Sequence, residues 1–458
     1  MTELRKSSNK GVSFCLAIGL SILLILACGA PVLAKDTKVT PTDTVITALE
    51  YSPRLQVLQH NQMAIGHELD EAKGGYYPKV DLAFGYGAEA HSDTTTRYIT
   101  DNPHNFYDRL EASLRLSQLI YDGKETSSKV AIEDAKLVSA GSRTFDNAEA
   151  IALDALIAHT EVYRQRELVG LAEMNIRDHQ EILNMLEERQ EGGAGSIADV
   201  DQTRARLARA QASLAETQAA LRSAEANYQR FVGKIAGDLE FYMPDKGLVP
   251  TSLDQALEAT TMNNPKINAL GANVVEAGQR VTLTKSSFLP KVHAELSTSY
   301  EDNVESSTTY EHNNQAMLRL RWNLYNGGSN VAAREAAIER KMQAVSQRDD
   351  QRDMVLEEVR ITWAELESAR HQVVSFGDSV TFNQKTLDSY MKQFNVGQRT
   401  LLDVLDARNE LFQSSGLLVT ARTNESVASG RLLALAGQLT ESLQVKEDVY
   451  MVKMIEEE

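Results

Sequence analysis

Two carboxylates lie one helical turn apart in the stretch VGQRTLLDVLDARNELF, Val396 to Phe412. They belong to Asp403 and Asp406, and Arg399 lies just before them. Two acids at this spacing could act as a general acid and base, hold a metal ion, line a charged constriction or form a solvated surface. Thr400 could also cap a helix that begins here, and an early acid favours the positive end of a helix. Residue types alone leave these alternatives open.

Other kinds of chemistry find little support in the sequence. We find no Gly-rich phosphate loop, nucleophile elbow or paired-histidine metal motif. Histidines in the helical segments are scattered, which is more typical of solvated or packed side chains than of ligands; they are His60, His67, His159, His179 and His371. The net charge of −17 argues against a nucleic acid partner. We therefore expect a protein that is not an enzyme and has no cofactor and no metal site.

The N-terminus has the features of an export signal. Basic residues precede the apolar core VSFCLAIGLSILLILA, and VLA before Lys35 resembles a cleavage site. We predict a signal peptide over residues 1–34. A membrane anchor and lipidation of Cys28 are the alternatives, but the core is short and Leu26 fits a lipidation motif poorly. Cys15 and Cys28 both lie in this segment, so cleavage would leave no cysteine.

The remaining chain is a duplicated half-protein. YPKVDLAFGYG is echoed by LPKVHAELSTS, LRLSQLIYDG by LRLRWNLYNG, and DVDQTRARL by DVLDARNEL. We predict a first repeat over 35–250, a second over 251–440 and an acidic C-terminal tail over 441–458. Each repeat should hold a shorter helix, two strands and a long helix pair, with a linker over 234–251.

Two segments in each half alternate between apolar and polar residues. We predict strands at about 78–91, 105–121, 290–302 and 314–326. About ten residues is enough to cross a bilayer at a tilt, and the charged face would suit a water-filled lumen. Tyr121, Trp322 and Tyr325, near strand ends, would suit a membrane interface. The alternative is a soluble antiparallel sheet with its charged face in solvent.

The segments after the strands are typical of long helices. We predict helix pairs over 123–233 and 329–437, and shorter helices at about 42–74 and 252–287. The first pair turns at Gly192, Gly193 and Gly195, and the second turns at Gly397. The second helix of the first pair carries apolar residues seven apart, which form one seam of a coiled-coil heptad. Mostly small residues fill the other seam positions and permit close helix packing. The seam residues are Val200, Leu207, Leu214, Leu221 and Tyr228.

Four strands of this kind cannot close a barrel by themselves. Open strand edges are not tolerated in lipid, and a small closed barrel needs about eight strands. Two copies of the chain would supply eight strands with a filled interior, whereas three would supply twelve and leave a pore. The interpretation as a membrane protein therefore requires oligomerisation.

The strand ends LRLSQLIYDG and LRLRWNLYNG, the duplicated element order and VGQRTLLDVLDA together resemble the TolC family of outer-membrane channels. The last motif and GYYPKVDLAFGYG are most similar to the branch that serves type I secretion. The resemblance covers about Thr42 to Leu443. It implies a mixed α and β fold, in which a homotrimer forms one twelve-stranded outer-membrane β-barrel. A long α-helical coiled-coil barrel would continue it through the periplasm.

The resemblance also assigns roles to single residues. Asp403 and Asp406 match two aspartate rings that form a cation-selective gate at the periplasmic entrance. Arg399 matches an arginine that ties the closed gate, and Asp199 matches its carboxylate partner. Two positions depart from the family pattern, since Phe394 replaces a tyrosine and Ala198 a threonine. The details of the closed gate should differ accordingly.

The predicted function is that of a trimeric outer-membrane channel forming the exit duct of a type I secretion system. The implied partners are a periplasmic adaptor (membrane fusion) protein, an inner-membrane ABC transporter, a secreted polypeptide cargo and outer-membrane lipid. The alternatives are the outer component of a tripartite drug or metal efflux pump and, from another class, a periplasmic coiled-coil scaffold. A passive conduit carries little substrate code in its wall, so the sequence identifies neither cargo nor pump.

Overall fold

The structure is a computed structural model that describes residues 38–91, 106–193, 195–245, 247–304 and 309–452. The chain divides into two units, Met1–Lys38 and Val39–Glu458. The described helices and strands all belong to the second unit. The predicted signal peptide over 1–34, with Cys15 and Cys28, lies outside the described residues.

Four antiparallel strands form one sheet in the order β1-β2-β3-β4, which confirms the predicted strand content. Their bounds are β1 Lys79–Glu89, β2 Tyr107–Tyr121, β3 Lys291–Asp302 and β4 Tyr310–Arg321. The fourth strand begins and ends earlier than the predicted 314–326. Arg321 pairs with Lys291, the first residue of β3, so the chain beyond Arg321 has no strand partner. Trp322 and Tyr325 therefore follow the strand instead of belonging to it.

The register of the sheet separates an apolar face from a charged face. Val80, Leu116, Leu296 and Ala316 lie side by side across the four strands. The opposite face carries ion pairs of Arg109 with Glu89 and Glu111, and of Arg319 with Glu295. Because successive side chains of a strand point to opposite faces, the alternation in the sequence becomes two chemically distinct surfaces.

The helices repeat the same arrangement in both halves. Those of the first half are α1 Pro41–Tyr51, α2 Pro53–Gly74, α4 Glu125–Glu191 and α5 Ile197–Val232. Those of the second half are α6 Leu253–Asn263, α7 Pro265–Ser286, α8 Ser329–Asn395 and α9 Leu401–Leu435. None of the helices in the described ranges has both the length and the apolar character needed to cross a membrane.

Each of the two shorter helices that we predicted is in fact a pair of helices. The breaks fall at Ser52–Pro53 and Asn264–Pro265. A proline disfavours helical backbone in the residue before it and lacks the N–H that a helix interior needs. Ser52 and Asn264 instead cap the second helix of each pair, by accepting hydrogen bonds from Leu55 N and Ile267 N.

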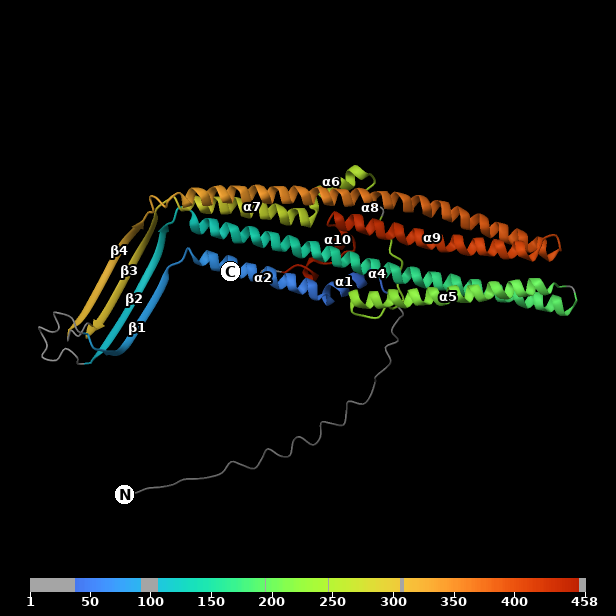
Figure 1. Ribbon diagram of the computed structural model, residues 1–458, viewed down its shortest axis with the longest axis horizontal. Helices are drawn as coiled ribbons and strands as arrows, with labels where there is room; N and C mark the ends of the chain where they lie inside the picture. Colours follow the sequence, from blue (N-terminus) through green and yellow to red (C-terminus); the bar gives the residue numbers. More distant parts are fainter. Residues whose placement is uncertain (1–37, 92–105, 194, 246, 305–308, 453–458) are drawn as a thin grey trace, which may run out of the picture. The chain divides into compact units, whose positions relative to one another are not determined.

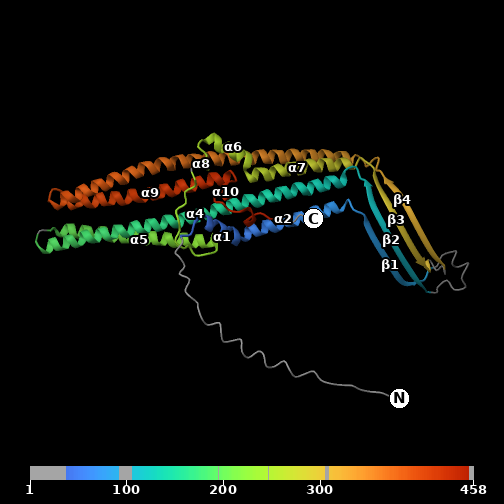
Figure 2. The same ribbon diagram turned by 180° about the vertical axis from the view of Figure 1, so that it is seen from behind.

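The long helices pack as antiparallel pairs, α4 with α5 and α8 with α9. In Figures 1 and 2 the strands lie beyond one end of the helices, where α2, α4, α7 and α8 meet the sheet. The α4–α5 and α8–α9 turns lie at the other end. The predicted heptad seam of α5 is present, since Val200, Leu207 and Tyr228 are buried. This arrangement confirms the prediction of long helices packed as coiled coils.

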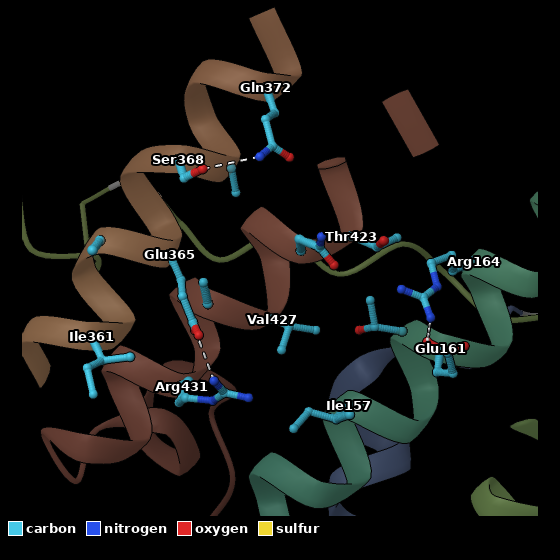
Figure 3. Close-up of a pocket in the computed structure, with 15 residues that line it drawn as sticks. Ile157, Glu161, Arg164, Ile361, Glu365, Ser368, Gln372, Thr423, Val427 and Arg431 are labelled. Atoms are coloured by element: carbon cyan, nitrogen blue, oxygen red, sulfur yellow. Dashed lines mark hydrogen bonds and ion pairs between the residues drawn. The ribbon is translucent and has the colours of Figure 1, made fainter. Parts of the chain in front are cut away.

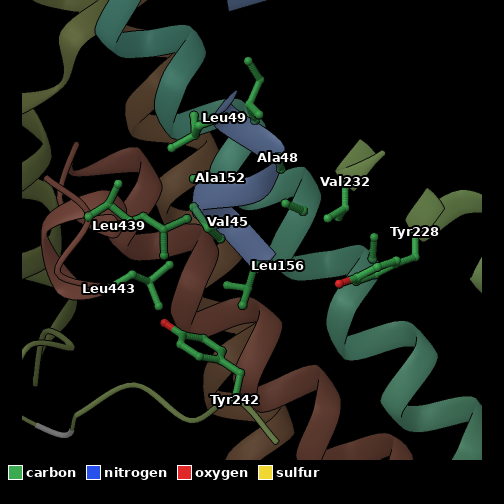
Figure 4. Close-up of a cluster of buried hydrophobic side chains, with 14 of the residues drawn as sticks. Val45, Ala48, Leu49, Ala152, Leu156, Tyr228, Val232, Tyr242, Leu439 and Leu443 are labelled. Atoms are coloured by element: carbon green, nitrogen blue, oxygen red, sulfur yellow. The ribbon is translucent and has the colours of Figure 1, made fainter. Parts of the chain in front are cut away.

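The largest apolar cluster lies where helices from both halves meet. Figure 4 shows Val45 and Leu49 of α1, Leu156 of α4 and Tyr228 of α5 converging. Leu439 and Leu443 of the C-terminal segment contribute to the same cluster. Burial of these side chains removes apolar area from water and holds the middle of the helix pairs together.

The C-terminal segment is packed rather than a free tail over its first part. It contains α10 Leu439–Ser442 and the 3₁₀ helix η2 Glu447–Val449. Leu443, Val445 and Tyr450 are buried, because their apolar side chains complete the cluster around α1 and α4. The first part of the predicted acidic tail over 441–458 is thus packed on the helices, and residues 453–458 lie outside the described residues.

Candidate functional site

The turns of the two long helix pairs place the candidate residues. Gly193 has φ of +74° and Gly397 has φ of +76°, a backbone conformation that favours glycine. Gly192 caps the end of α4. A Cβ on Gly195 would lie 2.8 Å from Gln190 N, so the first turn leaves no room for a side chain there. All four predicted turn glycines thus lie in the tight turns between antiparallel helices.

Asp403 acts as a helix-capping residue in one chain. Thr400 Oγ1 donates to Asp403 Oδ2 at 2.8 Å, and Thr400 N donates to the same oxygen at 3.3 Å. Asp403 N in turn donates to Thr400 Oγ1 at 3.4 Å. This reciprocal capping box satisfies N–H groups that have no partner at a helix start. The helix cap that the sequence suggested for Thr400 is therefore present. It uses only Oδ2 of Asp403, so the other carboxylate oxygen has no role in the cap.

Asp406 has different surroundings from Asp403. Its carboxylate lies 2.8 Å from the guanidinium of Arg206, which belongs to α5 of the other helix pair. The Asp406 side chain is 61% exposed and that of Arg206 is 24% exposed. Both aspartates line one groove of about 270 Å³, together with Tyr390 and Asn383 of α8. The two carboxylates therefore share a face of α9, although only one of them pairs with the first helix pair.

Arg399 contacts its own helix pair. Its Nε donates to Gln393 Oε1 at 3.1 Å, and its guanidinium lies 4.0 Å from the centroid of the Tyr390 ring. One of its terminal nitrogens is 3.8 Å from Asp403 Oδ2. No ion pair joins Arg399 to Asp199 among the described residues of a single chain. The predicted tie between these two residues thus stays a prediction for an assembly of several chains.

The two positions that depart from the family pattern have different surroundings. Phe394 is buried, and the guanidinium of Arg189 lies 4.7 Å from the centroid of its ring. This cation–π contact joins α4 to α8 at the position where a tyrosine would offer a hydroxyl. Ala198 donates its N–H to Ser196 Oγ, the capping side chain of α5, at 3.2 Å. At the tip, Phe394 therefore contributes apolar and cation–π contacts, whereas the methyl side chain of Ala198 is exposed.

Apolar side chains from four helices join the two turns. We call this group the tip cluster. It consists of Ile182, Leu183 and Leu186 of α4, Val200 and Leu207 of α5, Leu387 and Phe394 of α8, and Leu401, Val404, Leu405 and Ala407 of α9. Val404 is 0% exposed and Leu405 is 2% exposed. Residues adjacent to these in α9, Asp403 and Asp406, are consequently held at a defined position relative to α4 and α5.

Charged groups surround one side of the tip cluster. Arg408 of α9 forms an ion pair with Asp178 of α4, and its side chain is only 14% exposed. His179 beside it is buried. Burial lowers the pKa of His179, the Arg206 and Arg408 guanidinium groups lower it further, and Asp178 opposes them. His179 is thus neutral near pH 7, and the group formed by Asp178, Arg206, Asp406 and Arg408 has balanced charge.

Sequence reasoning missed Arg206, Tyr390, Asp178 and Arg408. Arg206 lies next to the seam residue Leu207, which indicated that it sits at the edge of a helix interface. Nothing in the sequence indicated a partner on α9, because no periodic rule relates residues that far apart. Tyr390 lies one helical turn before Phe394, the position where the family pattern has a tyrosine. Only the structure shows that its ring contacts the Arg399 guanidinium.

A second groove, of about 790 Å³, lies between α4, α8 and α9 (Figure 3). Its charged groups are paired, since Arg431 contacts Glu365 at 3.0 Å and Arg164 contacts Glu161 at 2.5 Å. Across the described ranges, no group of three or more His, Cys, Asp or Glu side chains is placed to hold a metal ion. The tip is thus the better candidate for a functional site.

Comparisons with known proteins agree with this architecture. A family model described as "Outer membrane efflux protein" matches residues 45–234 and 256–438, which is more than half of the chain. The chain is 28% identical to the outer membrane efflux protein BepC of Brucella suis, over 81% of this chain and 79% of BepC. It is 24% identical to the alkaline protease secretion protein AprF of Pseudomonas aeruginosa, over 86% and 84% of the two chains.

A more distant relative and a solved structure each match most of this chain. The outer membrane protein TolC of Escherichia coli is 21% identical over 85% of this chain and 80% of TolC. Among solved structures, the CmeC outer membrane channel of Campylobacter jejuni superimposes with a TM-score of 0.73. It is 12% identical and the match covers 87% of this chain and 86% of that one, so this likeness concerns the fold alone.

Proposed function

The chain belongs to the outer membrane efflux protein family, and from this premise we propose that its homotrimer is the exit channel of a type I secretion system. The protein is a TolC-family outer membrane channel with a periplasmic extension, and it is a transport protein, not an enzyme.

The open edges of the sheet are the main support for a trimeric assembly. β1 and β4 each pair with a single strand, so each has an edge of unpaired backbone groups within one chain. Such edges are not tolerated in lipid, and three copies would pair them all in a twelve-stranded barrel. The apolar row Val80, Leu116, Leu296 and Ala316 would then face lipid, and the charged face would line the pore.

The gate of the proposed channel is the end formed by the α4–α5 and α8–α9 turns. In a trimer, Asp403 and Asp406 would place about six carboxylates in one constriction, which attracts cations. Arg399 and Asp199 would tie neighbouring chains when the gate is closed. Two observations support this tie. Asp199 is exposed at the start of α5, and the nearest nitrogen of Arg399 is as far as 3.8 Å from Asp403 Oδ2, which is a long ion pair within the chain.

A polypeptide cargo is supported by the relative AprF, whose name describes secretion of an alkaline protease. On this proposal the tip docks a periplasmic adaptor (membrane fusion) protein and, through it, an inner-membrane ABC transporter. The second candidate is the outer component of a drug or metal efflux pump. The relative BepC supports it, since that protein is described as an efflux protein.

Deletion of the gene decides between these two candidates. We expect the loss of one or a few large proteins from the culture supernatant, measured by mass spectrometry and restored by the wild-type gene. Unchanged supernatant proteins combined with increased sensitivity to drugs or metal ions would favour the efflux pump. A neighbouring operon with an ABC transporter, an adaptor and a repeat-rich secreted protein would favour secretion.

The channel itself is tested on the purified protein. We expect the protein in the outer membrane fraction, a crosslinked trimer and cation-selective pores in planar bilayers. Recovery as a soluble periplasmic monomer would support the coiled-coil scaffold and contradict the channel.

A further inference from the structure

The two candidate gate carboxylates differ in how their charge is compensated. Asp403 accepts hydrogen bonds from Thr400, a neutral residue of its own helix turn. The nearest nitrogen of Arg399 is 3.8 Å away, whereas the Arg206 guanidinium is 2.8 Å from Asp406. An ion pair at the shorter distance compensates the charge of a carboxylate more fully.

Arg206 is held toward Asp406 by its position in α5. Leu207, the next residue, is 8% exposed and packs in the tip cluster with Leu405 of α9. The Arg206 side chain is itself only 24% exposed, so much of its length lies against protein. The position of the guanidinium is thus fixed by packing between the helix pairs, and not by the ion pair alone.

A second ion pair crosses the same seam two residues further along α9. It joins Arg408 of α9 to Asp178 of α4. The two pairs have opposite polarity, since α9 provides the acid in one and the base in the other. Opposite polarity disfavours a shift of α9 along its neighbours, because a shift would bring like charges closer. Asp406 and Arg206 are therefore kept in register.

We propose that Arg206 is a specificity-determining residue that cancels the charge of Asp406 while the two helix pairs of a chain are packed at the tip. In that state the net negative charge of the entrance comes from Asp403. The Asp406 carboxylate becomes available to attract cations when α5 and α9 move apart. This inference rests on the proposed function, and it makes the cation preference of the channel depend on the state of its tip.

The test measures ion selectivity of the full-length protein in planar bilayers. The two readouts are the reversal potential in a KCl gradient and block by La³⁺ added on the tip side. Arg206→Gln should free Asp406 and raise both the K⁺ over Cl⁻ permeability ratio and the affinity for La³⁺. One additional unit charge at a few ångströms in water predicts a rise of roughly twofold to fivefold. Asp406→Asn alone leaves Arg206 as an unpaired cation and should lower both quantities, whereas Asp406→Asn combined with Arg206→Gln has a neutral pair and should return both to about the wild-type values.

Two further variants separate charge from structure. The exchanged pair, Arg206→Asp with Asp406→Arg, restores the ion pair and should return selectivity to that of the wild type. Arg209 lies three residues after Arg206 in α5; it is exposed and forms no ion pair among the described residues. Arg209→Gln should therefore change neither readout. Crosslinking of each variant verifies that the trimer is intact.

The possible contrary results distinguish an error in the proposed function from an error in the inference about Arg206. If wild-type protein forms no cation-selective pores, the proposed function itself is contradicted. If it does, and Arg206→Gln leaves both readouts unchanged while Asp406→Asn lowers them, Asp406 already contributes its charge and the inference about Arg206 is overturned. An exchanged pair that keeps the selectivity of Arg206→Gln would overturn it as well.

Discussion

At the scale of single residues, the tip shows that two identical side chains one turn apart can have unlike surroundings. Asp403 faces the start of its own helix, whereas Asp406 faces Arg206 of α5. The spacing of three residues predicted a common face of a helix, and both acids do line one groove. The partners of each acid come from the packing of α9 against α5, which the spacing does not contain.

Arg399→Ser is predicted to raise the conductance of the resting channel. Arg399 holds the α8–α9 turn through Gln393 and the ring of Tyr390, contacts worth together roughly 1–3 kcal/mol. Their loss would shift the population toward open tips by roughly 5-fold to 160-fold. Single-channel recordings at low voltage measure this. Lys392→Ser, which removes an exposed charge from the same turn, is the control and should leave the resting conductance unchanged.

Glu149 is a buried acid that the sequence did not single out. It is 2% exposed and accepts hydrogen bonds from Leu439 N at 2.9 Å and from Thr440 N at 3.0 Å. Burial raises its pKa from 4.5 to about 7, which outweighs the opposing effect of the hydrogen bonds from Thr440 and Leu439. The carboxyl group thus connects α4 to the C-terminal segment in a way that depends on pH.

Docking of the C-terminal segment should weaken as pH rises from about 5 to 8. With the segment docked, Glu149 binds its proton up to about pH 7; once exposed, it would lose it near its usual pKa of 4.5. The docked state therefore binds more protons across this interval. Its stability is greatest below pH 4.5 and decreases through pH 7, by up to roughly 3 kcal/mol. Hydrogen exchange of residues 439–450 at several pH values measures this stability.

Glu149→Gln is the matched variant for this prediction, because glutamine keeps the shape and an acceptor oxygen but does not titrate. Its segment should show a smaller change in protection between pH 5 and 8 than the wild type. An equal pH dependence in both proteins would assign the effect to other groups, such as Asp146, whose pKa burial also raises.

At the scale of elements, the internal repeat provides an experiment within one chain. Gly123 and Gly327 are equivalent residues at the two junctions between a strand and a long helix, with φ of +67° and +57°. A Cβ on Gly123 would lie 2.6 Å from Leu289 Cβ, whereas a Cβ on Gly327 would meet nothing within 4 Å in the described chain. The same glycine thus has a conformational role at both junctions and a packing role at one.

Gly123→Ala should destabilise the protein more than Gly327→Ala. Both substitutions cost roughly 1–2 kcal/mol, because alanine disfavours the left-handed conformation. Gly123→Ala adds a cost of about 1–3 kcal/mol for overpacking against Leu289. Thermal unfolding followed by circular dichroism measures the difference. Equal losses would show that the junction at Leu289 relaxes, or that a neighbouring chain occupies the space at Gly327.

The breaks between α1 and α2 and between α6 and α7 occur at a local signal, a capping residue followed by proline. Both repeats carry a capping residue followed by proline, Ser52–Pro53 and Asn264–Pro265. Apolar periodicity continues across these sites and predicts one helix. The backbone rule for the residue before a proline is local and applies regardless of the periodicity, so it ends the first helix of each pair.

At the scale of the whole molecule, the two faces of the sheet lead to a prediction about assembly. Leu296 lies in the apolar row near the middle of β3, and Ser297 lies on the opposite, charged face between Arg115 and Gln315. Leu296→Arg should reduce the amount of trimer in the outer membrane. Placing arginine on a lipid-facing position near the bilayer centre costs roughly 2–4 kcal/mol per chain.

Ser297→Arg is the control for this prediction, since it adds the same side chain to the face assigned to the pore. Trimer amounts close to wild type are expected for it, as judged by fractionation and crosslinking. Comparable losses for the two variants would argue against the assignment of one face to lipid and the other to water.

The sequence by itself determined the features that depend on local periodicity. Alternation of period two in the strand segments, the heptad seam of α5 and the glycines of the two turns required no knowledge of distant contacts, because each reflects backbone geometry over a few residues. The internal repeat and the family motifs then indicated the order of the elements and the outer-membrane channel.

Only the tertiary structure decided which distant side chains meet. Arg206 pairs with Asp406 across two helix pairs, and Glu149 binds Thr440, which is 291 residues further along the chain. It also decided that Leu443, Val445 and Tyr450 are part of the central cluster. The physical reason is that burial and ion pairing depend on how rigid helices pack against one another, and a single helix pattern contains no information about its partner's register.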